Sequence, residues 1–270
     1  MMLLHWVAVR EKRCSAKDRN AAHKRMLLVT RPQPEADILA ERLRGMGFET
    51  LIQPMLHIHF LDDAAALTPR ETLQAILTTS ANGVRALARH RKHLGGDIPL
   101  LAIGKATARE AHSNGFAPVS VASGDANSLV ELATQQCRRD AGELLHVCGR
   151  DISVDIVSLL QARDFSARRI TLYEARATER LDVSVITAIR KGHIKGILFY
   201  SRRTAEIWNK LVCAAGLREH CINITAYCLA SSAAEAAARL PFRDILTARN
   251  PDEAEIFALL EALAYKGLKG

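Results

Sequence analysis

The sequence has few aromatic residues and no long hydrophobic run. Phe, Trp and Tyr make up 5% of the 270 residues, although hydrophobic residues as a whole make up 49%. This content is enough for real cores, but no segment approaches the roughly 18 apolar residues of a membrane span. Low aromatic content with abundant Ala and Leu favours helices packed on sheets. We therefore expect a soluble protein of about two domains.

Several motifs of cofactor-dependent enzymes are absent from the chain. There is no G-x-G-x-x-G and no Walker A motif, which argues against a nucleotide cofactor. There is no H-E-x-x-H motif for zinc and no G-x-S-x-G elbow for a hydrolytic serine. The 6 cysteines are scattered without a C-x-x-C pair, which indicates reduced thiols in the cytoplasm. These absences argue against a nucleotide cofactor and against a zinc site.

Positive charge is concentrated near the N-terminus. The formal net charge is +8, of which residues 1–25 contribute 5 and the remaining 245 residues only 3. The body of the chain has no stripe of basic and aromatic residues, so we expect no nucleic-acid partner. Met26 immediately precedes the first predicted strand, and we expect residues 1–25 to be a disordered extension or the product of a mis-assigned start. An organellar presequence is disfavoured, because Glu11 and Asp18 are unusual in one.

The rest of the sequence nearly repeats itself. Five landmarks recur in the same order, and the offset of the first four runs from 119 to 125 residues. A steady offset indicates two copies of one supersecondary plan, and therefore two similar domains with a cleft between them. The paired segments are 27–31 with 145–150, the strand around Pro54 with that around Tyr173, 78–86 with 199–205, 101–108 with 227–234, and 123–132 with 248–257.

Each copy alternates short strands with helices. Strands alternating with helices of about 10–15 residues predict a parallel sheet with helices on both faces. The fold class is therefore α/β, with two similar three-layer, parallel-sheet domains of flavodoxin-like or Rossmann-like type. In the first copy we expect strands at 26–30, 49–58 (interrupted at Pro54), 75–78, 100–103 and 118–122, and helices at 34–45, 82–90, 107–114 and 127–138; the second copy repeats this order from Leu144.

Candidate binding residues lie in the turns that follow the strands. At that edge of a parallel sheet, free backbone N–H groups, hydroxyls and helix dipoles favour anionic ligands. Two such edges, one in each domain and here called rims, would suit one large ligand with several anionic groups. The candidates are Thr30, Arg31, Ser80, Ala81, Asn82, Gly104, Lys105, Thr107, Gly149, Arg150, Ser201, Arg202, Ala230, Ser231 and Ser232.

Simpler roles stay open for these residues. Hydroxyl residues at helix starts are first of all N-caps. Gly104 and Gly149 can serve only to permit tight turns, and Arg31 and Arg150 can be surface arginines as well as anion ligands. Ser80 and Ser201 have no assignable base, so neither is predicted to be a nucleophile.

Two other features invite a functional interpretation. His57 and His59 alternate on one strand and therefore face the same side, where a solvent-facing surface is favoured over a metal pair. Tyr173 stands at a strand end. It is either a buried anchor of the sheet or, near the domain junction, the best candidate for a polar group inside the cleft.

The ordered motifs resemble the uroporphyrinogen-III synthase family. They are L-L-V-T-R-P, T-S-A-N-G-V-R-A, A-I-G-K-A-T-A-R-E-A, G-D-A-N-S-L and I-T-L-Y-E-A, and the match runs through residues 26–260. No single motif is specific, but the ordered set is. The second copy departs from the pattern, because Leu229 stands where a glycine is usual and Ser231-Ser232 replace a threonine pair.

The resemblance implies both an architecture and a reaction. It implies one domain of about 26–55 plus 177–270, another of about 56–176, and a two-stranded linker between them. The reaction is the cyclisation of hydroxymethylbilane to uroporphyrinogen III, with loss of water and inversion of ring D through a spiro intermediate. The resemblance implies no cofactor and no metal. It also implies a cytoplasmic monomer, with no membrane partner and with a hand-over of substrate from hydroxymethylbilane synthase.

The resemblance also implies how the site residues act. Hydroxymethylbilane cyclises unaided to the wrong isomer, so the enzyme mainly has to orient it. Its carboxylates would be gripped by the backbone N–H groups, hydroxyls and arginines of the turns. A tyrosine matching Tyr173 is the family's favoured group for assisting the loss of water. The competing possibility is a non-catalytic module that senses a tetrapyrrole or another anionic ligand. A periplasmic-type binding protein is disfavoured by the absent signal peptide, and a hydrolase or dehydrogenase has least support.

Overall fold

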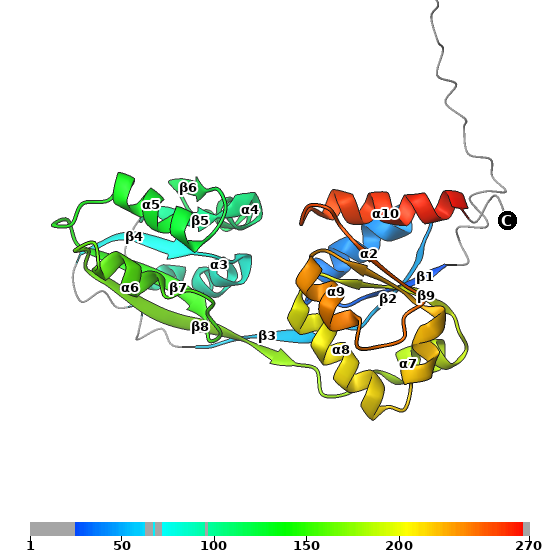
Figure 1. Ribbon diagram of the computed structural model, residues 1–270. Coiled ribbons are helices and arrows are strands. Elements are labelled where there is room, and N and C mark those ends of the chain that lie inside the picture. Colours follow the sequence, from blue (N-terminus) through cyan, green and yellow to red (C-terminus); the bar gives the residue numbers. More distant parts are fainter. Residues whose placement is uncertain (1–24, 63–66, 68–71, 95–96, 267–270) are drawn as a thin grey trace, which may run out of the picture. The chain divides into compact units, whose positions relative to one another are not determined.

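The computed structural model describes residues 25–62, 67, 72–94 and 97–266 (Figure 1). The expectation for residues 1–25 therefore falls almost wholly outside the described residues. The chain divides into two compact units: unit 1 is Met1–His57 with Ala177–Gly270, and unit 2 is Ile58–Arg176. In the part of the chain that the structure describes, no helix is long and apolar enough to cross a membrane.

Unit 1 is built on a five-stranded sheet in which all neighbours are parallel. The order is β11-β10-β9-β1-β2. The strands are β1 (Met26–Val29), β2 (Glu49–Ile52), β9 (Ile194–Phe199), β10 (Thr225–Cys228) and β11 (Asp244–Thr247). β1 lies inside the sheet and is apolar, as expected of a strand that is covered on both faces.

Helices cover both faces of this sheet (Figure 1). Side chains of β1 alternate between the faces: Leu27 and Val29 pack with α2 (Glu35–Gly45) and α10 (Glu253–Lys266), whereas Leu28 packs on the other side. That other side is covered by α7 (Val183–Arg190), α8 (Arg202–Ala214) and α9 (Ser231–Ala237), with the 3-10 helix η3 (Arg218–Asn223) beside them.

Unit 2 contains a six-stranded sheet of order β3-β8-β7-β4-β5-β6. Its five strands from β8 to β6 are parallel. The strands are β3 (Leu56–Phe60), β4 (Leu73–Thr78), β5 (Leu100–Ile103), β6 (Val119–Ala122), β7 (Glu143–Gly149) and β8 (Ala167–Ala177). One face carries α3 (Ala81–Ala88) and α4 (Gly104–Ser113), with η2 (Arg91–His93) after α3, and the other carries α5 (Ala126–Gln136) and α6 (Ile156–Gln161).

The two sheets share one plan. Each copy of the sequence repeat gives its opening βαβ to one unit and its remaining strands to the other. Unit 1 thus combines β1 and β2 with β9–β11, while unit 2 combines β7 and β8 with β4–β6. Matching β1 with β7 and β9 with β4 makes the spatial order of the five parallel strands the same in both units. The α/β class with helices on both faces of parallel sheets is confirmed.

The structure differs from the sequence prediction in places. Residues 49–58, expected as one interrupted strand, form β2 in one sheet and β3 in the other. Backbone N–H groups of Gln53 and Met55 still donate to Val29 and Thr30, at 2.9 and 3.0 Å. Pro54 between them has no N–H to donate, but pairing with the β1 segment continues past it to Met55, and the chain enters the other sheet at Leu56. Helix α4 also begins three residues earlier than predicted, at Gly104 rather than Thr107.

Candidate functional site

In unit 2, two candidate turns diverge from neighbouring strands. Helix α3 leaves β4 for one face of the sheet, and α6 leaves β7 for the other. Such a topological switch point is where open α/β sheets bind ligands, just beyond the carboxyl ends of the strands. Ser80, Ala81 and Asn82 follow β4, while Gly149 and Arg150 end and follow β7.

Tyr173 reaches this switch point from β8. It is in register with Gly149, and the backbone N–H of Arg150 donates to the Tyr173 carbonyl at 2.9 Å. A Cβ built on Gly149 would lie 2.7 Å from Cε2 of Tyr173 and 3.1 Å from its hydroxyl oxygen. The phenol therefore lies directly over a glycine, in a space that a larger residue would fill.

The environment of Tyr173 favours a protonated phenol. Burial raises its pKa above the ordinary value, and the side chain of Ser80 and the backbone of Gly149 offset part of this rise. A phenol with an ordinary pKa is already protonated at neutral pH, so this one can donate a proton. Tyr173, Ser80 and Gly149 form a cluster with one available acid.

Arg150 has a carboxylate partner beside this cluster. Its Nη1 lies 3.0 Å from Oε2 of Glu174, the residue after Tyr173. Glu174 is buried, and Nε of Arg176 also donates to it, at 2.5 Å. The side chain of Arg150 is 64% exposed, so it keeps N–H groups directed to solvent.

Ser80 and Ser201 both act as N-caps. The Ser80 hydroxyl accepts from the backbone N–H of Asn82 at 3.1 Å, and Ser201 accepts from that of Thr204 at 3.3 Å. The capping role left open by the sequence is therefore present at both turns. A capping hydroxyl still has its own O–H to donate, so capping does not exclude a ligand. Asn82 is half-buried, and its amide oxygen accepts from Arg85 at 2.9 Å.

Helix α4 begins without a side-chain cap. Ile103 is at the N-cap position, and Gly104 has a φ of +76° with no atom within 4 Å of a built Cβ. This left-handed backbone conformation favours glycine, and no side chain caps the first N–H groups of the helix. Lys105 is exposed beside them, whereas Thr107 is buried within the unit.

In unit 1, a side chain caps the start of α8 but not the start of α9. Arg202 donates from Nε to Glu206 at 2.9 Å, so it is tied to its own helix. Ala230 is the N-cap residue of α9 and supplies no side-chain bond, while Ser231 and Ser232 are exposed in the first turn. The hydroxyls of α9 are thus more open to a ligand than the hydroxyl that caps α8.

The switch point of unit 1 lies between β1 and β9. Here α2 and α8 leave for opposite faces, and the turn after β1 holds Thr30 and Arg31. Thr30 is buried and donates its hydroxyl proton to the Leu198 carbonyl at 2.5 Å, which gives it a structural role. Arg31 lies over the Tyr200 ring, with Cζ 4.4 Å from the ring centroid.

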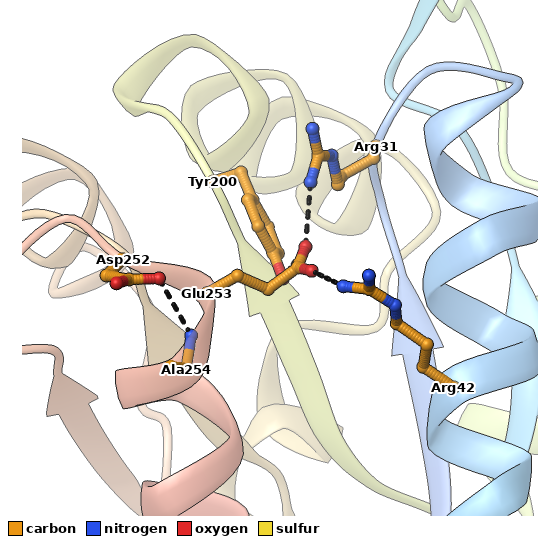
Figure 2. A network of polar contacts seen from close by, with 6 residues as sticks. All are labelled: Arg31, Arg42, Tyr200, Asp252, Glu253 and Ala254. Atoms are coloured by element: carbon orange, nitrogen blue, oxygen red, sulfur yellow. Dashed lines mark hydrogen bonds and ion pairs between the residues drawn. The ribbon is translucent and has the colours of Figure 1, made fainter. Parts of the chain in front are cut away.

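Sequence reasoning missed the partner of Arg31. Glu253, at the start of α10, accepts from Nη1 of Arg31 at 3.0 Å, from the Tyr200 hydroxyl at 3.1 Å and from Nη1 of Arg42 at 2.5 Å (Figure 2). Asp252 caps the same helix by accepting from the backbone N–H of Ala254 at 3.0 Å. The only local signal was that the segment containing Glu253 occupies a landmark of the repeat.

The histidine pair is exposed. His57 and His59 lie on β3 and both face solvent, as strand alternation predicts. Among the described residues, no three His, Cys, Asp or Glu side chains gather in a way that could hold a metal ion.

Comparisons with known proteins identify the family. A family model described as uroporphyrinogen-III synthase HemD matches residues 37–258. The porphyrin biosynthesis protein HemD of Ruminiclostridium josui is 26% identical over 248 residues, which cover 87% of this chain and 48% of that protein. The chain therefore spans about half the length of this curated relative.

Solved structures show the same fold. A mutant uroporphyrinogen III synthase of Thermus thermophilus is 18% identical, with a TM-score of 0.53 over 91% of this chain and 100% of that one. The uroporphyrinogen-III synthetase of Helicobacter pylori is 17% identical, with a TM-score of 0.56 over 88% of this chain and 99% of that one. Because the family model covers most of the residues that form the two units, the chain belongs to the uroporphyrinogen-III synthase HemD family.

Proposed function

We propose that the protein is a uroporphyrinogen-III synthase. It cyclises hydroxymethylbilane to uroporphyrinogen III with loss of water and inversion of ring D, in tetrapyrrole biosynthesis. The observation that carries the proposal is the Tyr173 phenol at the switch point of unit 2, beside Ser80 and over Gly149. Family membership supports the same reaction.

Tyr173 acts as the general acid. Its proton passes to the hydroxyl that leaves the substrate, and the C–O bond breaks to release water. Ser80 and the Gly149 backbone, which both favour the ionised phenol, stabilise the phenolate that results. The substituted carbon of ring D bonds to the carbon that lost the hydroxyl, which gives the spiro intermediate, and its older bond to the neighbouring methylene carbon then breaks. The unsubstituted α-carbon of ring D bonds to that methylene carbon and loses its proton. That proton restores the phenol, so the cycle is balanced.

The turns bind the carboxylates of the substrate. The N–H groups at the start of α4, which no side chain caps, together with Lys105 and the exposed Ser231 and Ser232, provide donors for anionic groups. Arg31 and Arg150 provide guanidinium groups, which bind carboxylates through paired N–H donors. We propose the remaining residues of these turns, from Ser80 to Asn82 and from Ser201 to Arg202, as further contacts.

Orientation is the larger part of the catalytic task. The substrate cyclises without help, so the protein gains isomer III by holding the chain while the substituted carbon of the last ring attacks. We propose that residues 26–55 plus 177–270 and residues 56–176 act as the two domains that hold it. The protein would work as a cytoplasmic monomer and receive its substrate from hydroxymethylbilane synthase.

A coupled assay tests this function. Porphobilinogen and hydroxymethylbilane synthase generate the linear substrate in place, and the oxidised uroporphyrin isomers are separated by chromatography. A shift from isomer I to isomer III on adding the protein is the expected result. Unchanged isomer I from a folded protein that still binds uroporphyrin III would instead indicate a non-catalytic binding module.

A further inference from the structure

Glu253 joins three segments that lie far apart in the sequence. Its carboxylate accepts from Arg31 in the β1–α2 turn, from Arg42 in α2 and from Tyr200 at the end of β9 (Figure 2). The Arg31 and Glu253 side chains are 28% and 25% exposed, so their ion pair is partly shielded from water. A partly shielded, hydrogen-bonded pair constrains its members more than a surface pair does.

This network fixes the plane of the Arg31 guanidinium. Tyr200 supports one face of the group at 4.4 Å, and Glu253 holds Nη1 at 3.0 Å. Tyr200 also donates its hydroxyl to the same carboxylate oxygen that Arg31 contacts, so ring and guanidinium share one anchor. Figure 2 shows the other terminal nitrogen of Arg31 pointing away from Glu253.

Arg42 balances the charge at the outer side of the network. It is 58% exposed and binds Oε2 of Glu253, which leaves Oε1 for Arg31 and Tyr200. The two arginines and one carboxylate leave one unit of positive charge at the switch point. An anionic ligand is therefore still attracted to Arg31.

We propose that Glu253 is a positioning residue for ligand binding. It holds Arg31 against Tyr200 so that the outward edge of the guanidinium meets a carboxylate of the ligand in a fixed orientation. A guanidinium that is already oriented loses less conformational freedom when it binds a carboxylate in bidentate fashion. The inference rests on the proposed function, in which the ligand is the polycarboxylate hydroxymethylbilane.

A double-mutant cycle tests this role. Steady-state kinetics in the coupled assay would compare the wild type with Glu253→Gln, Arg31→Ala and the double variant. Glu253→Gln keeps the shape of the side chain but removes its charge, and we expect KM to rise about tenfold, the effect of losing one charge-assisted hydrogen bond, with kcat within about twofold. In the Arg31→Ala background, Glu253→Gln should not raise KM further, because the guanidinium that Glu253 holds is absent.

A matched control separates positioning from helix electrostatics. Glu255→Gln removes the same charge from the same first turn of α10, and its side chain is outside the Arg31 network. We expect its KM to stay within about twofold of the wild type, since the interaction of α10 with a nearby charge is small and screened. Thermal melting of each variant would show that the fold is retained.

The outcomes distinguish this inference from the proposed function. A lower KM for Glu253→Gln would mean that Glu253 competes with the ligand for Arg31, and an equal effect with and without Arg31 would mean that Glu253 acts elsewhere; either overturns the inference. If the wild type forms no isomer III, the function fails, and fluorescence titration with uroporphyrin III still tests the same cycle through Kd.

Discussion

Tyr173 is the single residue on which the proposed chemistry depends. Replacing it with Phe removes the acidic proton and leaves the ring that packs over Gly149. We expect kcat for isomer III to fall by about a hundredfold or more, the usual contribution of a general acid, with little change in Tm. The control is Tyr227→Phe, which removes a hydroxyl from a core tyrosine of unit 1. Near-normal turnover of Tyr173→Phe would remove this residue from the mechanism.

Gly149 sets the position of that phenol. In Gly149→Ala the new methyl group would meet the Tyr173 ring at 2.7 Å, so ring or strand must shift. Overpacking of this kind costs about 1–3 kcal/mol, and we expect lower stability together with a marked loss of kcat. Gly45→Ala is the matched control, because a Cβ there meets nothing within 4 Å. Chemical denaturation and the coupled assay would both be measured, and a fully active Gly149→Ala would show that the position of the ring is not critical.

At the scale of elements, helix caps separate structural from ligand-binding serines. Ser201 caps the 13-residue helix α8, whereas Ser231 lies in the first turn of α9 and Ala230 holds the cap position there. Ser201→Ala should therefore lower the free energy of unfolding by about 1 kcal/mol. Ser231→Ala should change it by less than about 0.5 kcal/mol. Urea denaturation of the two variants tests this, and equal losses would contradict the assignment of caps.

The central strand β7 of unit 2 carries a buried histidine with no partner among the described residues. His146 is 2% exposed, and neither ring nitrogen has a hydrogen bond within that part of the chain. Burial, and then the charge of Arg169, lower its pKa from 6.5 to about 4. The folded protein thus holds the ring neutral at a pH where the unfolded chain would protonate it.

This histidine makes stability fall as the pH falls. The pKa of His146 in the folded protein lies below its value in the unfolded chain. The stability that the neutral ring contributes is therefore complete above about pH 6.5 and is lost progressively toward pH 4. At pH 5 the loss is roughly 2 kcal/mol relative to pH 7. His146→Leu should remove this part of the pH dependence without lowering stability at pH 7, since it also removes unpaired polar atoms. Urea denaturation at both pH values measures the free energy of unfolding. If its change between pH 5 and pH 7 is the same in the variant as in the wild type, His146 is not the source of that change.

The sequence predicted elements well where the signal is local. Helix α2 was expected at 34–45 and forms at Glu35–Gly45, between a proline and the glycines that end it. The strand at 100–103 matches β5 because an apolar run lies between turn residues. The pattern of residues 49–58 did not show their split between two sheets, because apolar alternation continues past Pro54 and does not reveal which sheet a strand joins. Only the family resemblance implied a domain boundary near residue 55.

The residues of the candidate site were less predictable. The strand-to-helix turns were found from their motifs, and all of them follow strands in the structure. Glu253 was missed because it lies 222 positions from Arg31, and no local pattern links an acid in α10 to a turn after β1. Tyr200 was missed for the same reason, since its contact with Arg31 depends on the parallel pairing of β1 and β9.

At the scale of the whole molecule, the repeat gives the two units matching switch points. Each sheet has the same order of parallel strands, and each switch point has an arginine at the matching turn, Arg31 or Arg150. Both arginines pair with a glutamate and lie beside a tyrosine, but Tyr200 directly follows β9, whereas Tyr173 lies on β8. The two rims therefore share a plan and differ in chemistry, with the available acid in unit 2.

The most direct test of the central claim is the isomer ratio as a function of protein concentration. Hydroxymethylbilane would be generated at a constant rate, the protein titrated in, and the uroporphyrin isomers quantified. If the protein orients the last ring and assists the loss of water, the fraction of isomer III should rise from near zero until almost all product is isomer III. If folded protein leaves the product as isomer I at every concentration, the claim is wrong.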